Sequence, residues 1–308
     1  MSDADYQLII VGGGPAGLTA GLYAGRAKIK TALLEKGVLG GQVLITDRIE
    51  NYPGFPEGIS GFDLIEKFTG MEALSDIEIK LGATVSSMNL AGPLKKINLD
   101  NGAVLTSQTL IIATGAGPHR LNVPGEAELI GKGVSYCATC DGPFYRGLEI
   151  AVVGGGNTAI QEAIHLTKFA GKVTVIHRRD QLRATKILQE RAFANDRIDF
   201  ILDSVVTLIK GDKEVTAVHV KNKKREETAL PVQGVFVLVG VRPNNEMLPM
   251  DQLETKDGFV VTDDEMRTNI PGVMAAGDIR SKTVRQIVNA AGEAAVALQS
   301  AEHYLVNF

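Results

Sequence analysis

Cys137 and Cys140 are the only cysteines of this 308-residue chain, and two residues separate them. Thiols at this spacing can close a small disulfide, and a helix start stabilises a thiolate placed there. The pair offers too few ligands for a four-cysteine zinc site and no framework of structural disulfides. The spacing therefore predicts disulfide exchange. Asp141 follows directly, and the residues alone leave it open as a helix cap or as an acid that protonates a departing thiolate.

Two glycine-rich stretches can each bind a pyrophosphate. One spans 12–17 between an apolar strand at 8–11 and a helix expected at 18–26, and the other spans 154–159 between an apolar strand at 150–153 and a helix expected through 162–169. Glycines allow the turn and the approach of pyrophosphate, and the helix N-terminus supplies free N–H groups. Strand, glycine turn and helix in this order predict two dinucleotide sites.

The two copies keep a constant register along the chain. A shift of 142 residues relates their matching positions, which are Gly12 and Gly154, Gly14 and Gly156, Gly17 and Ala159, and Glu35 and His177. Each copy later closes with an apolar strand and a glycine, at 110–115 and at 235–240. We therefore expect two related nucleotide-binding domains.

The residue that ends the strand after each helix predicts the nucleotide. Glu35 can accept hydrogen bonds from a ribose diol, which suits an adenosine without a 2′-phosphate and so FAD. In the second copy His177 is followed by Arg178 and Arg179, with Arg183 a turn further on. Cations there would bind a 2′-phosphate by forked hydrogen bonds, which suits NADPH. A solvated run of charge is the alternative reading of these arginines.

A third strand, glycine and acid element at 272–278 precedes a helix expected at 284–305 and has no counterpart in the second copy. We expect it to return to the first domain, with crossings near Gly117-Pro118 and Arg242-Pro243. The predicted fold is α/β, with two Rossmann-like doubly wound nucleotide-binding domains, the second inserted into the first. The FAD-binding domain would comprise 1–117 and 244–308, and the NADPH-binding domain 118–243, with the dithiol.

Composition narrows the class of protein. The 32 Lys and Arg against 36 Asp and Glu give a net charge of -4, so we expect no nucleic acid or anionic membrane as partner. A basic run at 221–225 is followed by two glutamates, which predicts a solvated hairpin tip. The acidic start at 1–5 and the lack of a membrane-length apolar run predict a cytoplasmic protein.

The motifs together resemble those of low-molecular-weight bacterial thioredoxin reductases, and the resemblance covers the whole chain. It rests on the glycine turns, Gly40-Gly-Gln42, Glu50-Asn-Tyr-Pro-Gly54, Ala113-Thr-Gly115, Cys137-Ala-Thr-Cys-Asp141, His177-Arg-Arg-Asp180, Gly277-Asp278 and Arg285-Gln286. Such enzymes pass electrons from NADPH through FAD and a dithiol to the disulfide of thioredoxin.

The resemblance and the glycine motifs together give two sets of binding residues. Those expected to hold FAD are Gly12, Gly14, Pro15, Ala16, Glu35, Lys36, Gly40, Gly41, Gln42, Asn51, Val85, Thr114, Gly115, Gly277, Asp278, Arg285, Gln286 and Ile287. Those expected to hold NADPH are Gly154, Gly156, Asn157, Thr158, Ala159, His177, Arg178, Arg179, Arg183 and Gly240. No metal is expected.

The resemblance also implies roles and partners. It makes Cys140 the thiol nearest the flavin, Cys137 the thiol that attacks thioredoxin or a thioredoxin-like protein, and Asp141 the acid, in a homodimer. One departure is Gln161, where the family often has an acidic residue, and this could alter an interface between the domains. His119 and His165 are expected on polar surface.

Three other functions fit the same architecture. A dithiol oxidase would use FAD and oxygen without a working NADPH site, which the second glycine turn and its arginines disfavour. A ferredoxin-linked or quinone-type flavin reductase would reduce no disulfide, which the two cysteines disfavour. A redox-sensing flavoprotein without turnover would not oxidise NADPH steadily when given a disulfide acceptor.

Overall fold

The computed structural model describes residues 4–46 and 48–307. The chain forms two compact units, one from Met1–Gly117 with Arg242–Phe308 and one from Pro118–Val241. The chain returns to the first unit two residues before the expected position, 244. Residues 1–3 of the acidic start, which entered the prediction of a cytoplasmic protein, lie outside the described residues.

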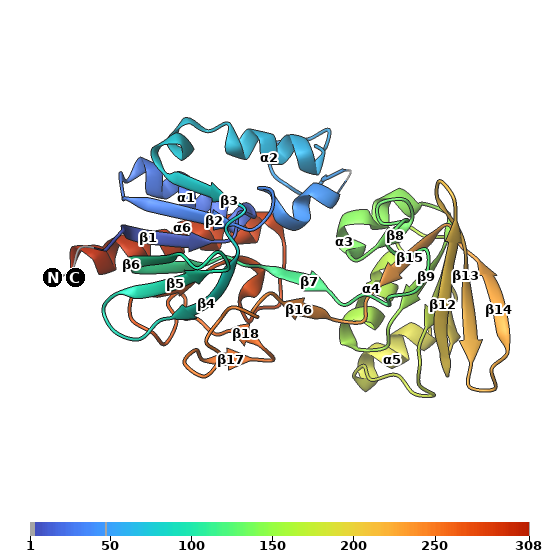
Figure 1. Ribbon diagram of the computed structural model, residues 1–308. Helices are drawn as coiled ribbons and strands as arrows, with labels where there is room; N and C mark the ends of the chain where they lie inside the picture. The colour runs from blue at the N-terminus through green and yellow to red at the C-terminus, as the bar shows by residue number, and fades with distance from the viewer. Residues whose placement is uncertain (1–3, 47, 308) are drawn as a thin grey trace. The chain divides into compact units, whose positions relative to one another are not determined.

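The first unit is built on a seven-stranded sheet (Figure 1). Strands β3, β2, β1, β6 and β19 pair in parallel in this order, with β19 on residues 110–112 of β6. The first residues of β6, 104–107, pair antiparallel with β5, which pairs antiparallel with β4. The strands are β1 (Tyr6–Val11), β2 (Thr31–Glu35), β3 (Glu78–Leu81), β4 (Val85–Asn89), β5 (Lys95–Leu99), β6 (Val104–Ile112) and β19 (Val273–Ala275). The central strands are apolar and buried, as a sheet covered on both faces requires.

Helices α1 and α6 pack together on this sheet through small side chains, including Ala20, Ala24, Ala294 and Ala297. The expected helix at 284–305 begins instead at Ile287, because Gln286 is extended and caps it. The helical elements of the unit are α1 (Pro15–Arg26), η1 (Gly41–Ile45), α2 (Gly61–Thr69), η2 (Glu72–Asp76), η4 (Gly277–Ile279) and α6 (Ile287–Val306). A small hairpin of β17 (Thr255–Lys256) and β18 (Phe259–Val260) completes it.

The second unit has a five-stranded parallel sheet in the order β11, β10, β9, β15, β8. Its strands are β8 (Val134–Ser135), β9 (Glu149–Val153), β10 (Lys172–Ile176), β11 (Ile198–Ile201) and β15 (Gly234–Val237). Its helical elements are α3 (Ala138–Asp141), η3 (Gly142–Tyr145), α4 (Asn157–Leu166) and α5 (Lys186–Phe193). Helix α4 therefore ends three residues before the expected Phe169. The parallel strands at the centre of both sheets confirm the predicted α/β fold of two Rossmann-like units.

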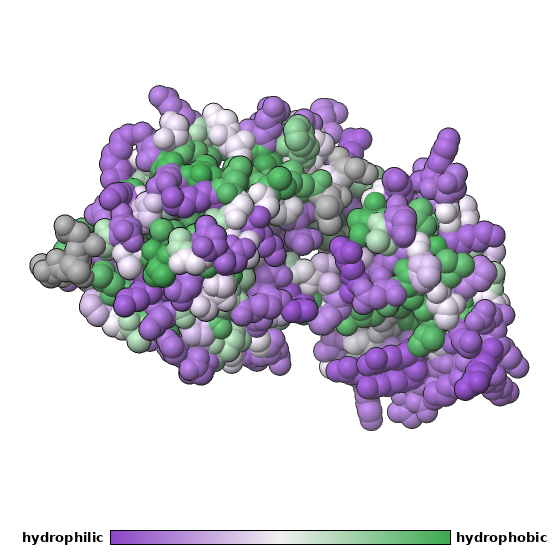
Figure 2. Space-filling view, viewed as in Figure 1, coloured by the Kyte–Doolittle hydropathy of each residue, from purple (hydrophilic) through white to green (hydrophobic). Residues whose placement is uncertain are grey.

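A separate antiparallel sheet lies in the second unit, formed by β12 (Ser204–Gly211), β13 (Val215–Asn222) and β14 (Glu227–Pro231). The basic run at 221–225 lies where β13 turns into β14, and Lys221 pairs with Glu227 across the ladder. This is the predicted hairpin tip. Figure 2 shows hydrophilic residues predominating around α5, a helix with one buried residue among its eight.

The structure corrects one expectation about the repeat. Strand β19 pairs with β6 in the first unit, and β8 pairs with β15 at the same edge of the second sheet. The element at 272–278 therefore has a positional counterpart, although that counterpart comes before its copy in the sequence rather than after it. The sequence pattern does not reveal this counterpart, because β8 has only two residues and precedes the second glycine turn.

The two crossings run side by side as a short ribbon of β7 (Ala116–Pro118) and β16 (Val241–Pro243). In the part of the chain that the structure describes, no helix has both the length and the apolar character needed to cross a bilayer.

Candidate redox and nucleotide-binding sites

The first glycine turn leaves open space above its second glycine. Gly14 precedes α1 as its N-cap, and a Cβ built on it would meet no atom within 4 Å. Gly12 has φ 112°, and a Cβ there would lie 2.3 Å from the carbonyl oxygen of Ala113. Gly41 approaches the turn from η1, since its Cβ would lie 3.5 Å from Cα of Gly14. Only glycine fits at Gly12, while the space above Gly14 is open for a phosphate.

Glu35 lies where β2 ends, and its carboxylate accepts two backbone hydrogen bonds. Oε2 accepts from the N–H of Gly13 at 2.7 Å and Oε1 from the N–H of Gly37 at 2.8 Å. A carboxylate has about four lone-pair sites, so acceptor capacity is left for a ribose diol. The N–H of Ala83, two residues before Val85, donates to the carbonyl oxygen of Glu35 at 3.0 Å.

Two buried polar atoms in the predicted FAD set, Oγ1 of Thr114 and Nε of Arg285, have no hydrogen-bond partner among the described residues. A third buried atom, Oδ1 of Asp278, forms no hydrogen bond within the described chain and lies 3.4 Å from the Lys282 ammonium, its ion-pair partner. Buried polar atoms are nearly always paired in folded proteins, so the two unpartnered atoms in one predicted site fit a polar ligand. The guanidinium carbon of Arg285 lies 4.3 Å from the ring centre of Phe259, which fixes one face of that side chain.

Residues far apart in the sequence meet at this site. The side-chain amide of Asn51 donates to Oε1 of Gln286 at 3.0 Å, across 235 positions. The side-chain amide of Asn244 donates to the carbonyl oxygen of Thr114 at 2.8 Å. The second crossing is thus joined to the loop that follows β6.

Sequence reasoning missed a buried charge network behind Asp278. Glu293, 7% exposed, accepts from the N–H of Gly277 at 2.8 Å, pairs with Arg280 at 2.7 Å and pairs with Lys282 at 3.1 Å. Lys282 lies 3.4 Å from Asp278. Burial raises the pKa of Asp278, and the Lys282 cation opposes that rise. An acid in the middle of an alanine-rich helix was the available signal, because such a residue is rarely buried without partners.

The second glycine turn repeats the first. Gly156 is the N-cap of α4 with open space above it, and Gly154 would place a Cβ 2.5 Å from the carbonyl oxygen of Leu238. The following loop docks on the turn, since the N–H of Arg183 donates to the carbonyl oxygen of Gly155 at 2.7 Å. Asn157 anchors the next helix by accepting from the N–H of Thr185 at 2.8 Å.

His177 takes the place of Glu35 but is 7% exposed. A Cβ on Gly155 would lie 2.3 Å from its Nδ1, so the ring packs directly against the turn. Burial lowers the pKa of His177, and the neighbouring Arg179 lowers it further. The ring is therefore neutral at neutral pH, and any phosphate there would have to be neutralised by the arginines. Its Nε2 is buried with no hydrogen-bond partner among the described residues.

Arg178, Arg179 and Arg183 are all exposed on the loop between β10 and α5. Among the described residues none of the three forms an ion pair. Three unpaired guanidiniums beside a glycine turn match a dianionic phosphate.

Cys137 and Cys140 form a disulfide, with their Cα atoms 5.3 Å apart. Cys137 is the N-cap of α3, and its sulfur accepts from the N–H of Cys140 at 3.2 Å. The predicted position at a helix start is correct, although α3 has only four residues. Ala138 is buried against α4, and a Cβ on Gly142 would lie 3.0 Å from Leu166, so the short helix is held closely to α4.

The acids available beside the disulfide are few. Asp141 ends α3 and accepts from the hydroxyl of Ser135 at 2.5 Å. Burial raises the pKa of Tyr145 to about 12, with a contribution from the charge of Asp141, and burial also raises the pKa of Tyr136. Both phenols therefore stay protonated at neutral pH, and Asp141 is the carboxyl group that the short helix carries directly after Cys140. Ser135 was not among the predicted site residues.

The structure collects each predicted set in one unit. The first unit holds every residue assigned to FAD, including Lys36, Gly40, Gln42, Gly115 and Ile287, and the second holds every residue assigned to NADPH as well as the disulfide. Thr158 and Gly240 are exposed, and Ala159 is buried. His119 is exposed as expected, whereas His165 is only partly exposed and meets the ring of Phe169 at 5.5 Å.

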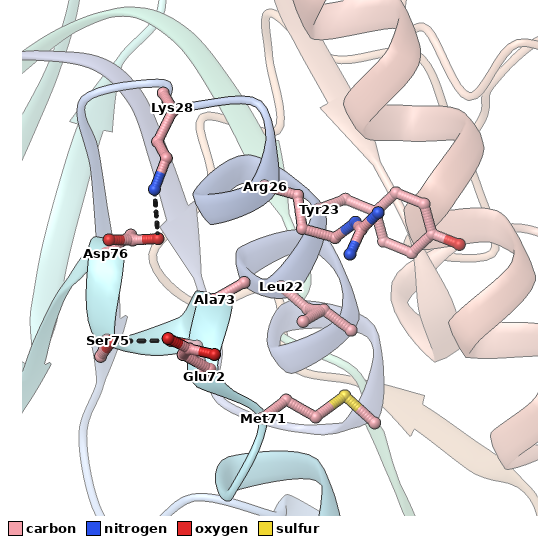
Figure 3. Close-up of a pocket in the computed structure, with 9 residues that line it drawn as sticks. All are labelled: Leu22, Tyr23, Arg26, Lys28, Met71, Glu72, Ala73, Ser75 and Asp76. Atoms are coloured by element: carbon pink, nitrogen blue, oxygen red, sulfur yellow. Dashed lines mark hydrogen bonds and ion pairs between the residues drawn. The ribbon is translucent and has the colours of Figure 1, made fainter.

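A surface hollow of about 920 Å³ lies elsewhere. Figure 3 shows it between the C-terminal end of α1 and η2, with Lys28 and Asp76 paired at its edge at 2.7 Å. It contains no predicted site residue. Among the described residues no group of three or more His, Cys, Asp or Glu side chains could hold a metal ion.

Comparison with known proteins gives consistent matches over the whole chain. The family model of pyridine nucleotide-disulphide oxidoreductases matches residues 6–294. The thioredoxin reductase of Listeria innocua is 44% identical over 302 residues, covering 97% of this chain and 94% of that protein.

Two solved structures extend the comparison. Thioredoxin reductase from Streptococcus pyogenes is 47% identical, with both chains covered completely and a TM-score of 0.93. Lactococcus lactis thioredoxin reductase, described as the FR conformation, is 45% identical over 99% of this chain and 100% of that chain, with a TM-score of 0.67.

Proposed function

The chain belongs to the pyridine nucleotide-disulphide oxidoreductase family and is a thioredoxin reductase, and from this premise we propose that its electrons pass from NADPH through FAD and the Cys137–Cys140 disulfide to thioredoxin. The observation that carries the proposal is the pairing of this disulfide with two glycine turns of opposite chemical character, one ending in Glu35 and one in arginines.

FAD fits the first unit. Its pyrophosphate would lie over Gly14 at the start of α1, and its adenosine ribose would bind Glu35. Thr114 and Arg285 would use their unpartnered atoms on the remaining polar groups, and Asp278 its remaining acceptor capacity. When bound, the flavin accepts a hydride from NADPH and passes two electrons to a disulfide.

NADPH fits the second unit as the hydride-donating substrate. Its pyrophosphate would lie over Gly156, and its 2′-phosphate would bind Arg178, Arg179 and Arg183. The dithiol oxidase reading requires that no such site works, so the three unpaired guanidiniums count against it. A quinone-type flavin reductase would have no use for the formed disulfide.

The dithiol performs the exchange. Reduction of the Cys137–Cys140 bond takes up two electrons and two protons and leaves two thiols. Cys137 releases its proton to solvent, and its thiolate attacks one sulfur of the thioredoxin disulfide, whose S–S bond breaks, while Asp141 gives a proton to the released thiolate. Asp141 takes a proton from Cys140, whose thiolate attacks the sulfur of Cys137. The disulfide re-forms, the second thioredoxin thiolate takes a proton from solvent, and reduced thioredoxin leaves.

The two thiols should then differ although their spacing is symmetric. In Cys137→Ser the remaining Cys140 thiolate should give the long-wavelength absorbance of a thiolate beside oxidised flavin. Cys140→Ser should lack that band and should form a stable mixed disulfide with thioredoxin. The opposite pair of spectra would reverse the assigned roles.

Both the nicotinamide and the disulfide must reach one flavin, and a single rigid arrangement would struggle to serve both. We propose that the second unit swings about the ribbon of β7 and β16. An enzyme tethered with Cys140 against the flavin should exchange electrons between them yet lose reduction by NADPH until the tether is cut. Unchanged reduction by NADPH would exclude the swing.

The experiment that tests the whole path is an anaerobic titration of the yellow protein. NADPH should bleach the flavin absorbance, and oxidised thioredoxin of the same host should restore it. Bleaching without recovery would exclude thioredoxin as acceptor, and failure to bleach would leave the oxidase or the sensing flavoprotein.

A homodimer and a cytoplasmic location complete the proposal. Sedimentation of the holoenzyme at micromolar concentration should give twice the 32.8 kDa mass of the chain. Fractionation of host cells should place the NADPH-dependent activity with the cytoplasmic proteins.

A further inference from the structure

Ser135 lies in β8, two residues before the disulfide, and is 3% exposed. Its hydroxyl contacts both ends of the short helix that bears the cysteines. The oxygen accepts from the N–H of Cys137 at 3.1 Å, lies 2.5 Å from Oδ2 of Asp141, and lies 3.3 Å from the carbonyl oxygen of Cys137. One buried hydroxyl therefore faces one donor and two acceptors.

A serine hydroxyl has one hydrogen to donate and two lone pairs to accept with, so these contacts cannot all be used at once. When Asp141 is ionised, the hydroxyl donates to its carboxylate at the shorter distance, 2.5 Å, and accepts from Cys137. When Asp141 carries a proton, that proton can be donated to Ser135 Oγ, and the hydroxyl can turn to the carbonyl oxygen of Cys137. Both charge states of Asp141 are then hydrogen-bonded.

We infer that Ser135 is a positioning residue that keeps Asp141 and Cys137 in place in both protonation states of Asp141. The inference rests on the proposed role of Asp141 as the acid. During thiol exchange the O–H bond of Asp141 breaks as an S–H bond forms on the released thiolate. The hydroxyl of Ser135 turns to the new carboxylate, and the reverse turn follows when Asp141 takes a proton from Cys140. No backbone movement is needed between the two states.

The position of Ser135 suits this task. Strand β8 holds its backbone through the pairing of Ser135 with Phe236, whose side chain is fully buried. Helix α3 has a single turn, which is not stable in isolation, so Asp141 depends on contacts outside the helix, namely the packing on α4 and the hydroxyl of Ser135. The hydroxyl thus connects the one-turn helix to the rigid sheet.

The test measures single-turnover reduction of thioredoxin by the pre-reduced holoenzyme from pH 5 to 9. Asp141→Asn identifies the part of the pH profile that belongs to the acid. In Ser135→Ala the carboxylate loses a donor, so the pKa of Asp141 should rise and that part of the profile should move up by about one pH unit. The matched control is Ser204→Ala, which removes a similarly buried hydroxyl of the same unit that donates to Leu202. Its profile should stay in place.

A second pair of variants separates the effect of losing the hydroxyl from the effect of changing the side-chain volume. Ser135→Thr and Ser135→Val have the same shape and differ only in the hydroxyl, so any effect of crowding is common to both. The threonine variant should keep the wild-type profile and the valine variant should show the upward shift. In the double variant Ser135→Ala with Asp141→Asn, the serine change should have no further effect on the profile.

The outcomes distinguish the inference from its premise. If Asp141→Asn removes the acid part of the profile but Ser135→Ala and Ser135→Val leave it in place, Ser135 has no positioning role and the acid stands. If Asp141→Asn leaves the profile unchanged, the proposed acid role itself is wrong, and the inference is overturned with it.

Discussion

In the first unit Glu35 closes the glycine turn by accepting from Gly13, while in the second the ring of His177 lies against Gly155. The backbone around both turns is nevertheless alike. The first glycine of each turn donates to the strand that follows, Gly12 to Leu34 and Gly154 to Ile176. The turns share their backbone and differ in their side chains, so the proposed pyrophosphate sites depend on the fold, whereas the proposed choice of nucleotide depends on the residues at one strand end.

The third glycine position differs in a way that only packing explains. A Cβ on Gly17 would lie 1.7 Å from the carbonyl oxygen of Gly12. The second copy has Ala159 there, fully buried, and its first glycine has φ 154° instead of 112°. The turn of the second copy is therefore opened enough to admit a methyl group.

The largest expected effect comes from exchanging that pair. Gly17→Ala should destabilise the first unit by at least about 3 kcal/mol, because backbone must move, and the protein should be isolated with little FAD. Ala159→Gly should cost only about 1 kcal/mol of helix propensity and leave FAD content unchanged. Flavin absorbance per protein and thermal unfolding measure both. Full FAD content in Gly17→Ala would show that the two turns are interchangeable.

The next effect concerns the cationic strand end. Changing both Arg178 and Arg179 to Ala should raise the KM for NADPH on the order of a hundredfold or more, from roughly 1.5 to 3 kcal/mol per lost contact. Weak use of NADH should stay nearly unchanged, because it has no 2′-phosphate. The double change Lys186→Ala with Arg191→Ala removes equal charge from exposed positions on α5 and serves as control. An equal rise of KM for NADPH and for NADH would show that the arginines do not bind the 2′-phosphate.

A smaller effect is expected at the acidic strand end. Glu35→Gln keeps the size of the side chain but turns an N–H group towards Gly13 or Gly37, each of which now donates to the carboxylate. Affinity for FAD should fall about tenfold, from the loss of about 1.4 kcal/mol. Equilibrium binding of FAD to the apoprotein measures it. The preference for NADPH over NADH should stay the same. A change in that preference would mean that Glu35 contributes to the NADPH site and not to the FAD site.

The smallest effect is one of pH. Burial and the neighbouring arginines lower the pKa of His177, so the folded second unit holds the ring neutral while the unfolded chain protonates it near pH 6.5. The unfolded state then binds more protons as pH falls below that value, and the stability of the second unit should decline from pH 7 to pH 5. Amide exchange of β9 and β10 measures it. His177→Gln should flatten the decline, and an unaltered slope would assign it to other groups.

The sequence predicted both glycine turns, the disulfide and the strand ends, because each depends on residue types that few other structures require. It could not predict Ser135, since a serine at the end of a strand has no distinctive pattern and its proposed role arises from contacts with Cys137 and Asp141 in space. The network of Glu293 and Lys282 was missed for the same reason.

Two other features could not be predicted from the local sequence. Lys95 is 1% exposed and donates to the carbonyl oxygens of Leu90 and Gly92, a burial that a lysine in a polar strand does not suggest. The place of β8 at the sheet edge depends on long-range pairing with β15. The sequence of a two-residue strand does not predict such a pairing.

The pairing of β19 with β6 and the packing of α6 on α1 have a consequence for synthesis of the chain. All of the second unit lies between 118 and 241, so it can fold while the ribosome is still adding the last sixty-odd residues. The first unit cannot, because its central strand lacks a neighbour and α1 lacks its cover until the C-terminal segment emerges. The unit that is translated first is therefore completed last, and a nascent chain stopped before β19 would carry a finished dithiol unit beside an unfinished flavin unit.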